Sequence, residues 1–145
     1  MTVSVGTVLP AWEVPAVSAE KMKTMAALLA DPNPIHWDAG VVSALGMGDR
    51  PVNQGPLNMA YVMNMLAAFS GGHENLRRFR VRFLGNVLAG DHLRATGVVT
   101  ALARGVGELL AECEVLLSVE GGGPVLGGTA TVALPDEATD IEEET

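Results

Sequence analysis

Residues 31–38, Asp-Pro-Asn-Pro-Ile-His-Trp-Asp, place two acid–base groups and an amide within six residues, namely Asp31, His36 and Asn33. Each proline disfavours the helical conformation for the residue before it, so Asp31 and Asn33 are expected to be extended. In a straight segment Asp31 and His36 would lie roughly 17 Å apart, but Asp-Pro and Asn-Pro favour turns that would bring them together. A carboxylate and an imidazole facing one cavity can share a water molecule, one taking a proton while the other delivers one. The alternative is that Asp31 caps a turn and His36 is an ordinary, partly buried ring.

The residues around this loop predict three helices. Ser18 is an N-cap candidate for a helix over residues 19–29, where apolar residues recur three and four apart. Asp38 is expected to cap a short helix over residues 39–45. Residues 57–69 are apolar on every side of a helix, yet about 15 residues, or roughly 22 Å, are too few to cross a bilayer. This segment is therefore predicted to be a helix surrounded by protein.

Strand-like runs follow the helices. Residues 2–17 are predicted to form a strand at an edge, because Pro10 and Pro15 interrupt it. Four more runs come after the apolar helix, at residues 78–83, 91–103, 107–119 and 124–134, with glycine-containing turns between the last three. Helices followed by consecutive strands favour an α+β fold with an antiparallel sheet. Length predicts a single domain, residues 1–135.

Composition limits the partners and the compartment. The net charge is −8, and six of the seventeen acids lie in residues 136–145, which contain no base. This tail is predicted to be a disordered acidic end, and the rest of the chain carries only −2. An acidic chain without a basic helix argues against nucleic acid as a partner. A single cysteine, no secretory leader and no membrane-spanning run predict a cytoplasmic protein without membrane insertion. Asp31, His36 and Asp38 together form a weak ligand set, so we expect no metal.

Residues 31–38 resemble the signature of the MaoC-like, (R)-specific enoyl-CoA hydratase/dehydratase family, which reads roughly Ser-Gly-Asp-x-Asn-Pro-Ile-His-x-Asp. Asp31, Asn33 and His36 fall on the matching positions, while Leu29 and Ala30 replace Ser-Gly. Residues 83–91 also resemble the family's Phe-x-x-Pro-Val-x-x-Gly-Asp stretch, with asparagine in place of the proline. The resemblance implies a single hot-dog fold, in which an antiparallel sheet wraps around one long helix.

The same resemblance implies that the protein adds water to 2-enoyl thioesters, or removes it from 3-hydroxyacyl thioesters, without a cofactor. Asp31 and His36 would hold and activate the water, and Asn33 would orient the loop or the water. The Gly55 N–H, at the start of the apolar helix, would bind the thioester oxygen. Gln54 stands where the family commonly has histidine, and Pro56 has no N–H to donate.

The substrate expected from the resemblance is an acyl-CoA or acyl-carrier-protein thioester. Gln54 and Asn58 are candidates to line its site, and Arg80 and Arg82 are candidates to contact its phosphates. Such a row of arginines is more often a solvated strand face. A single hot dog leaves a sheet edge open, so we expect a homodimer or assembly with a second hot-dog subunit. Two alternatives remain: a binding subunit with little activity alone and, less favoured because residues 57–69 contain no carboxylate, a thioesterase.

Overall fold

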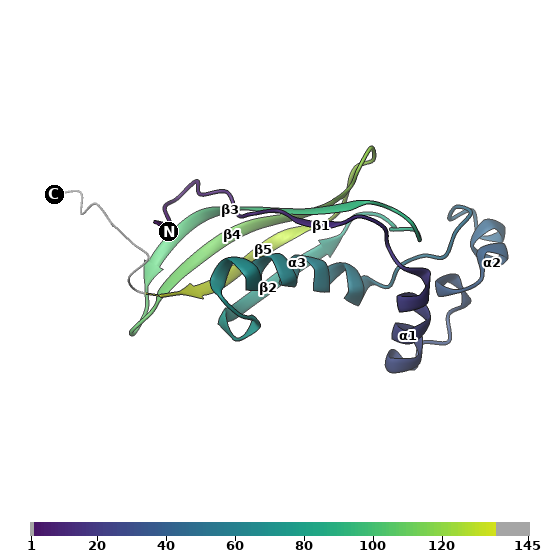
Figure 1. Ribbon diagram of the computed structural model, residues 1–145, viewed down its shortest axis with the longest axis horizontal. Coiled ribbons are helices and arrows are strands. Elements are labelled where there is room, and N and C mark those ends of the chain that lie inside the picture. The colour runs from purple at the N-terminus through teal and green to yellow at the C-terminus, as the bar shows by residue number, and fades with distance from the viewer. Residues whose placement is uncertain (1, 136–145) are drawn as a thin grey trace.

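A five-stranded antiparallel sheet curves around one long helix in the computed structural model, which describes residues 2–135 (Figure 1). The acidic tail predicted for residues 136–145 lies outside the described residues. The elements in chain order are β1 (Trp12–Val14), α1 (Ala19–Leu29), a 3₁₀ turn (Pro34–His36), α2 (Ala39–Ala44), α3 (Gly55–Ser70), a second 3₁₀ turn (His73–Asn75), β2 (Leu76–Phe83), β3 (Leu93–Arg104), β4 (Leu109–Val119) and β5 (Pro124–Leu134). This is the α+β arrangement that the sequence predicts.

The strands lie in the order β1-β3-β4-β5-β2, and every neighbouring pair is antiparallel. The three longest strands are consecutive in the chain and pair as hairpins. The two outer strands come from elsewhere: β1 precedes all helices, and β2 follows α3. Gly128 permits the close approach of β5 to β2, because a Cβ there would collide with the carbonyl oxygen of Arg80.

The inner face of the sheet and helix α3 form the core. On β4 every second residue from Leu109 to Leu117 is buried, as expected for a strand with one face against protein. The buried side of α3 includes Val62, Met65 and Leu66. Helix α3 begins two residues earlier than predicted and ends at Ser70, and the next residue, Gly71, adopts the left-handed conformation typical of a helix C-terminus.

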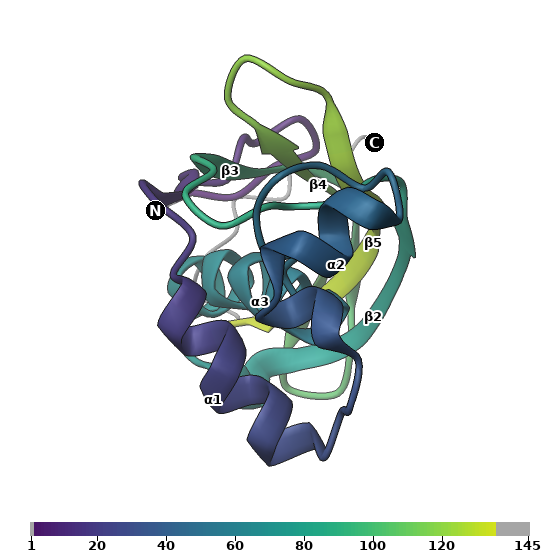
Figure 2. The same cartoon turned by 90° about the vertical axis from the view of Figure 1, so that its right-hand side faces the viewer.

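The smaller helices lie together at one end of the molecule. Figures 1 and 2 show α1 and α2 beyond the sheet, beside the N-terminal end of α3. Ser18 caps α1 as predicted, and Asp38 caps α2 through the N–H groups of Gly40 and Val41. The first predicted strand is much shorter than expected, because β1 fills only the space between Pro10 and Pro15. Among the described residues no helix is long and apolar enough to span a membrane.

Candidate active site

The loop that carries the candidate residues begins with a sharp turn at the end of α1. Ala30 adopts φ 50° and ψ 40°, and within residues 2–135 it is the only residue other than glycine with a positive φ. The N–H of Asp31 then donates to the carbonyl oxygen of Ala26 at 3.0 Å. Helix α1 therefore ends in a left-handed turn that directs the chain back, and Asp31 is its first residue beyond the turn.

Side chains of the loop hold its next two turns. Asp31 Oδ1 accepts a hydrogen bond from the N–H of Asn33 at 3.0 Å, and Asn33 Oδ1 accepts one from the N–H of Ile35 at 3.2 Å. Asn33 thereby caps the 3₁₀ turn, and Pro34 occupies a position that needs no N–H donor. Asn33 is exposed, and its side-chain oxygen is engaged in shaping the loop.

These turns bring Asp31 and His36 together. His36 Nε2 lies 3.2 Å from Asp31 Oδ2, and the side chains are 9% and 31% exposed, respectively. His36 Nδ1 lies 2.6 Å from the carbonyl oxygen of Val52. Because a carbonyl oxygen only accepts, Nδ1 carries the hydrogen, and Nε2 is the nitrogen that faces the carboxylate. The predicted pairing of the two side chains is present.

Val52 belongs to an extended segment that joins the two parts of the site. Its N–H donates to the carbonyl oxygen of Ile35 at 2.8 Å, and it forms a β-bridge with Leu88. Asn53 continues the segment by donating from its N–H to Val87 at 2.7 Å. Val52, whose carbonyl oxygen orients His36, therefore lies only three residues before Gly55, the first residue of α3.

Gly55 lies close to the ring of Phe83. A Cβ at residue 55 would lie 3.0 Å from Cζ of Phe83, so a side chain there would require that ring to shift. Within residues 2–135 we find no backbone hydrogen bond donated by the Gly55 N–H, whereas the N–H groups of Leu57 and Asn58 turn back to the carbonyl oxygen of Gln54. The free N–H and the positive end of the helix dipole favour an electron-rich ligand atom at this helix start.

Gln54 and Asn58 have partners inside the protein. Gln54 is 2% exposed, and its Nε2 donates to the carbonyl oxygen of Met22 in α1 at 2.7 Å. Asn58 Oδ1 accepts from Asn53 Nδ2 at 2.8 Å. Of these groups, the buried oxygens Gln54 Oε1 and Asn53 Oδ1 have no hydrogen-bond partner among the described residues. The two predicted substrate-binding residues thus hold the start of α3 against its neighbours.

Tyr61, the only tyrosine of the chain, joins this buried polar cluster. Its hydroxyl lies 3.4 Å from Asn53 Nδ2. Burial raises the pKa of Tyr61 above its ordinary value, and the hydrogen bond to Asn53 opposes that rise. The hydroxyl is therefore neutral at physiological pH and adds no charge to the cluster.

Solvent reaches Asp31 through a groove on the helix side of the molecule. The groove has a volume of about 450 Å³, and Asp31 lines it together with residues of α1 and Trp37. Arg80 and Arg82 lie elsewhere, in a separate groove of about 350 Å³ beside β5. Among residues 2–135 no cluster of three His, Cys, Asp or Glu side chains is arranged to hold a metal, and Asp38 is engaged as a helix cap.

Sequence reasoning missed three contributors to the site. Val52 acts through its backbone, which no side-chain pattern reveals, and it lies sixteen residues from His36. Asn53 and Tyr61 complete a polar cluster that closes only in the folded chain. A signal existed for Tyr61: it follows Asn58 by three positions on a largely apolar helix, so the two share one face.

The fold agrees with the comparison of this chain with known proteins. The MaoC like domain family matches residues 5–120, so the chain belongs to that family of hot-dog hydratases and dehydratases. No curated protein sequence matches the chain.

Solved structures show the same fold at low sequence identity. The (R)-hydratase from A. caviae involved in PHA biosynthesis is 26% identical, with a TM-score of 0.79 over 93% of this chain and 99% of that one. The ChsH1-ChsH2 complex from Mycobacterium tuberculosis is 20% identical, with a TM-score of 0.74 over 92% and 99% of the chains. The HadBC (3R-hydroxyacyl-ACP dehydratase) complex from the same organism is 19% identical, with a TM-score of 0.66 over 92% and 99%.

Proposed function

We propose that this protein is an (R)-specific hydro-lyase that interconverts 2-enoyl and 3-hydroxyacyl thioesters of coenzyme A or of an acyl carrier protein. The observation that carries the proposal is the Asp31–His36 pair, with 3.2 Å between Oδ2 and Nε2 and the other imidazole nitrogen bonded to Val52. Membership of the MaoC-like family and the 26% identical (R)-hydratase support it.

The proposed reaction is the addition of water across a conjugated double bond. One member of the Asp31–His36 pair takes a proton from water, and the oxygen bonds to C3 of the substrate. The π electrons move towards C2 and the thioester oxygen, and a proton delivered to C2 completes the product. With water and proton arriving from the same loop, addition is syn. The pair shares its protons, so base and acid are roles of the pair rather than of one residue.

Negative charge builds up on the thioester oxygen during this step. The Gly55 N–H is the proposed donor, because it is free and lies at the positive end of α3. One such donor typically contributes about 10²–10³ in rate. Asn33 is proposed to act by shaping the loop, and Gln54 and Asn58 by fixing the helix start. Arg80 and Arg82 are left out of the substrate site, because their groove contains no residue of the loop.

One alternative has a specific observation behind it. Phe83, which touches Gly55, is 51% exposed at the end of an edge strand, so the surface next to the proposed oxyanion site is open and apolar. The solved neighbours include complexes of two hot-dog chains. In this alternative the chain binds the thioester and a second hot-dog subunit completes the site. A thioesterase is less favoured, since α3 contains neither aspartate nor glutamate.

The test is an assay of the purified chain with crotonyl-CoA, which follows the enoyl-thioester absorbance and analyses the products by chiral chromatography. The proposal predicts loss of absorbance and formation of (R)-3-hydroxybutyryl-CoA. An inactive chain whose activity appears only when a second hot-dog subunit is added would support the subunit alternative. Release of free coenzyme A, detected with a thiol reagent, would point to a thioesterase and contradict hydration.

A further inference from the structure

The outer face of the sheet, turned away from α3, carries two rows of opposite charge. Strand β2 contributes three exposed arginines at alternate positions, Arg78, Arg80 and Arg82, which share one face because side chains alternate along a strand. Strand β4 contributes two exposed glutamates, Glu112 and Glu114. The two rows are separated by β5.

The strand register aligns the rows. Glu114 pairs with Thr129 of β5, and Thr129 pairs with Arg80 of β2. In the same way Glu112 lies opposite Thr131, which lies opposite Arg78. Each glutamate therefore stands at the same height along the strands as one arginine, two strands away. Strand β5 between them carries only small side chains on this face.

These five charges lack the partners that other surface charges have. Arg77 pairs with Glu108 at 2.8 Å, and Arg94 pairs with Glu13 at 2.6 Å. For the arginine and glutamate rows, by contrast, no ion pair is found within the described part of the chain. Charges in register that are left unpaired within one copy are available to a surface of complementary charge.

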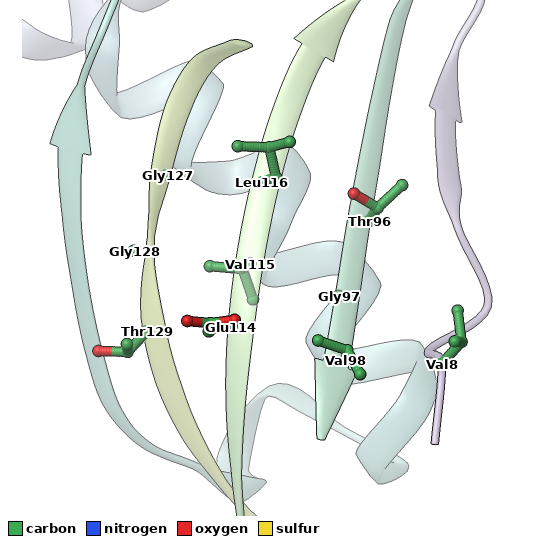
Figure 3. A pocket seen from close by; sticks show the side chains of 10 residues that line it. All are labelled: Val8, Thr96, Gly97, Val98, Glu114, Val115, Leu116, Gly127, Gly128 and Thr129. Carbon is green, nitrogen blue, oxygen red and sulfur yellow. The ribbon is translucent and has the colours of Figure 1, made fainter. Parts of the chain in front are cut away.

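An apolar groove lies beside the glutamate row. It has a volume of about 660 Å³ and runs across the outer face, where Val8, Val98 and Leu116 line it around Glu114 (Figure 3). In this view α3 lies behind the sheet, so the groove is on the face that the core does not use. Val8 is 73% exposed although its backbone forms a β-bridge with Val98 of β3.

We propose that a second copy of this chain packs on this outer face, related by a two-fold axis that runs along β5. Such an axis leaves height along the strands unchanged and exchanges the positions of β4 and β2. The register then places Glu114 of each copy opposite Arg80 of the other, and Glu112 opposite Arg78. Because a two-fold interface uses the same patch twice, four Glu–Arg pairs form.

The dimensions suit these residues. Stacked sheets lie about 10 Å apart, a gap that a glutamate and an arginine facing one another can bridge. The small residues of β5 on the axis, Gly127, Thr129 and Thr131, allow the two copies to approach closely. The arginine stems are apolar and can cover part of the groove, with Arg82 of one copy opposite Leu116 of the other.

The experiment measures the mass of the purified full chain by light scattering and sedimentation, at low and high salt. Arg80→Glu puts two carboxylates opposite each other, and Glu114→Arg does the same with two guanidinium groups. Each single variant should weaken this association by about tenfold or more. The double variant R80E/E114R restores opposite charges and should restore the mass. Lys21→Glu and Glu120→Arg make the same charge changes away from the face and serve as controls.

The expected result is an assembly that loses half its mass in either single variant, loses it in high salt, and recovers it in the double variant. If the copies also associate through the open edge of β2, that contact survives and the mass falls to half rather than to one chain. Masses that do not change in either single variant would overturn the proposal, as would association only with a different hot-dog chain. The pair R78E/E112R repeats the test at the next row should R80E/E114R fail to fold.

Discussion

Ala30 shows how one residue shapes the candidate site. It occupies a left-handed conformation at the position where the family signature has glycine, and the turn that it makes places Asp31 beyond the helix. A side chain in this conformation costs roughly 1–2 kcal/mol. Glycine would remove that cost, although it also gains freedom in the unfolded chain, worth about 0.4–1 kcal/mol.

We therefore predict that Ala30→Gly stabilises the protein by about 0.5–1 kcal/mol without loss of activity. A urea titration measures the change. Ala44→Gly, in the right-handed helix α2, is the matched control and should destabilise instead by a similar amount. A destabilised Ala30→Gly would show that the turn carries no strain.

The approach of Asp31 to His36 could largely be predicted from the sequence, because proline and aspartate determine the local backbone geometry. The turns of residues 31–36 follow from the Asp-Pro and Asn-Pro pairs, and they do bring Asp31 to His36. The contact that orients the imidazole could not be predicted. It depends on the backbone of Val52, which reaches His36 only once the extended segment has docked.

At the scale of elements, Gln54 links the two helices that carry the site. Its amide donates to α1 at Met22, and α1 ends at the turn that leads to Asp31. At the same time Gln54 precedes Gly55 and occupies the N-cap position of α3, where its side chain makes no capping hydrogen bond. One side chain thus connects the carboxylate-bearing loop with the proposed oxyanion donor.

We predict that Gln54→Leu lowers kcat more than it raises KM and costs about 1–3 kcal/mol of stability, because the buried hydrogen bond from the Gln54 amide to the Met22 carbonyl is lost. Steady-state kinetics and a denaturant titration measure the two effects. Val99→Ala, a core truncation on β3, is the control for destabilisation alone and should leave kcat nearly unchanged. A Gln54→Leu enzyme with normal kcat would refute the positioning role.

The helices and long strands were predictable because their periodicity is strong. Helix α1 has the predicted bounds, and α3 and β5 differ from their predictions by at most two residues. β1 was less predictable, since the sequence shows prolines but not which three residues pair with β3. The roles of Gln54 and Asn58 depend on packing between elements, so their amides could be noticed in the sequence but not assigned a partner.

At the scale of the whole molecule, the core encloses the single thiol. Cys113 is buried on β4, and burial raises its pKa from 9.0 to about 11. Between these values the unfolded chain loses the thiol proton while the folded chain keeps it, so the folded state binds more protons. The contribution of the Cys113 thiol to the free energy of unfolding is therefore fully present below pH 9 and is lost as the pH rises towards 11.

We predict that the free energy of unfolding falls between pH 8.5 and 10.5 and that Cys113→Ala reduces this fall by on the order of 2 kcal/mol. Urea titrations of the unaltered protein and of Cys113→Ala at the two pH values measure this difference. Because Tyr61 and the lysines are present in both proteins, their titration cancels in the comparison. An equal fall in both proteins would show that the thiol proton does not contribute to stability.

The order of helices and strands was sufficient to predict the α+β sheet around a central helix. The outer face was harder to interpret. The arginine row of β2 is visible in the sequence, but its alignment with the glutamates of β4 depends on the register of three strands. The charge pattern of the sequence therefore predicted that β2 has a cationic face. It did not predict that this face forms one surface with the glutamates of β4.

The central claim is that Asp31 and His36 act together on one water molecule. The most direct measurement is the rate of crotonyl-CoA hydration by Asp31→Asn and His36→Gln, each compared with a matched change at a surface residue, Asp49→Asn and His92→Gln. We predict that both site variants lose about 10²–10⁴ in kcat while their thermal melts stay close to that of the unaltered protein, and that both controls remain active. Hydration at the normal rate by either site variant would contradict the account.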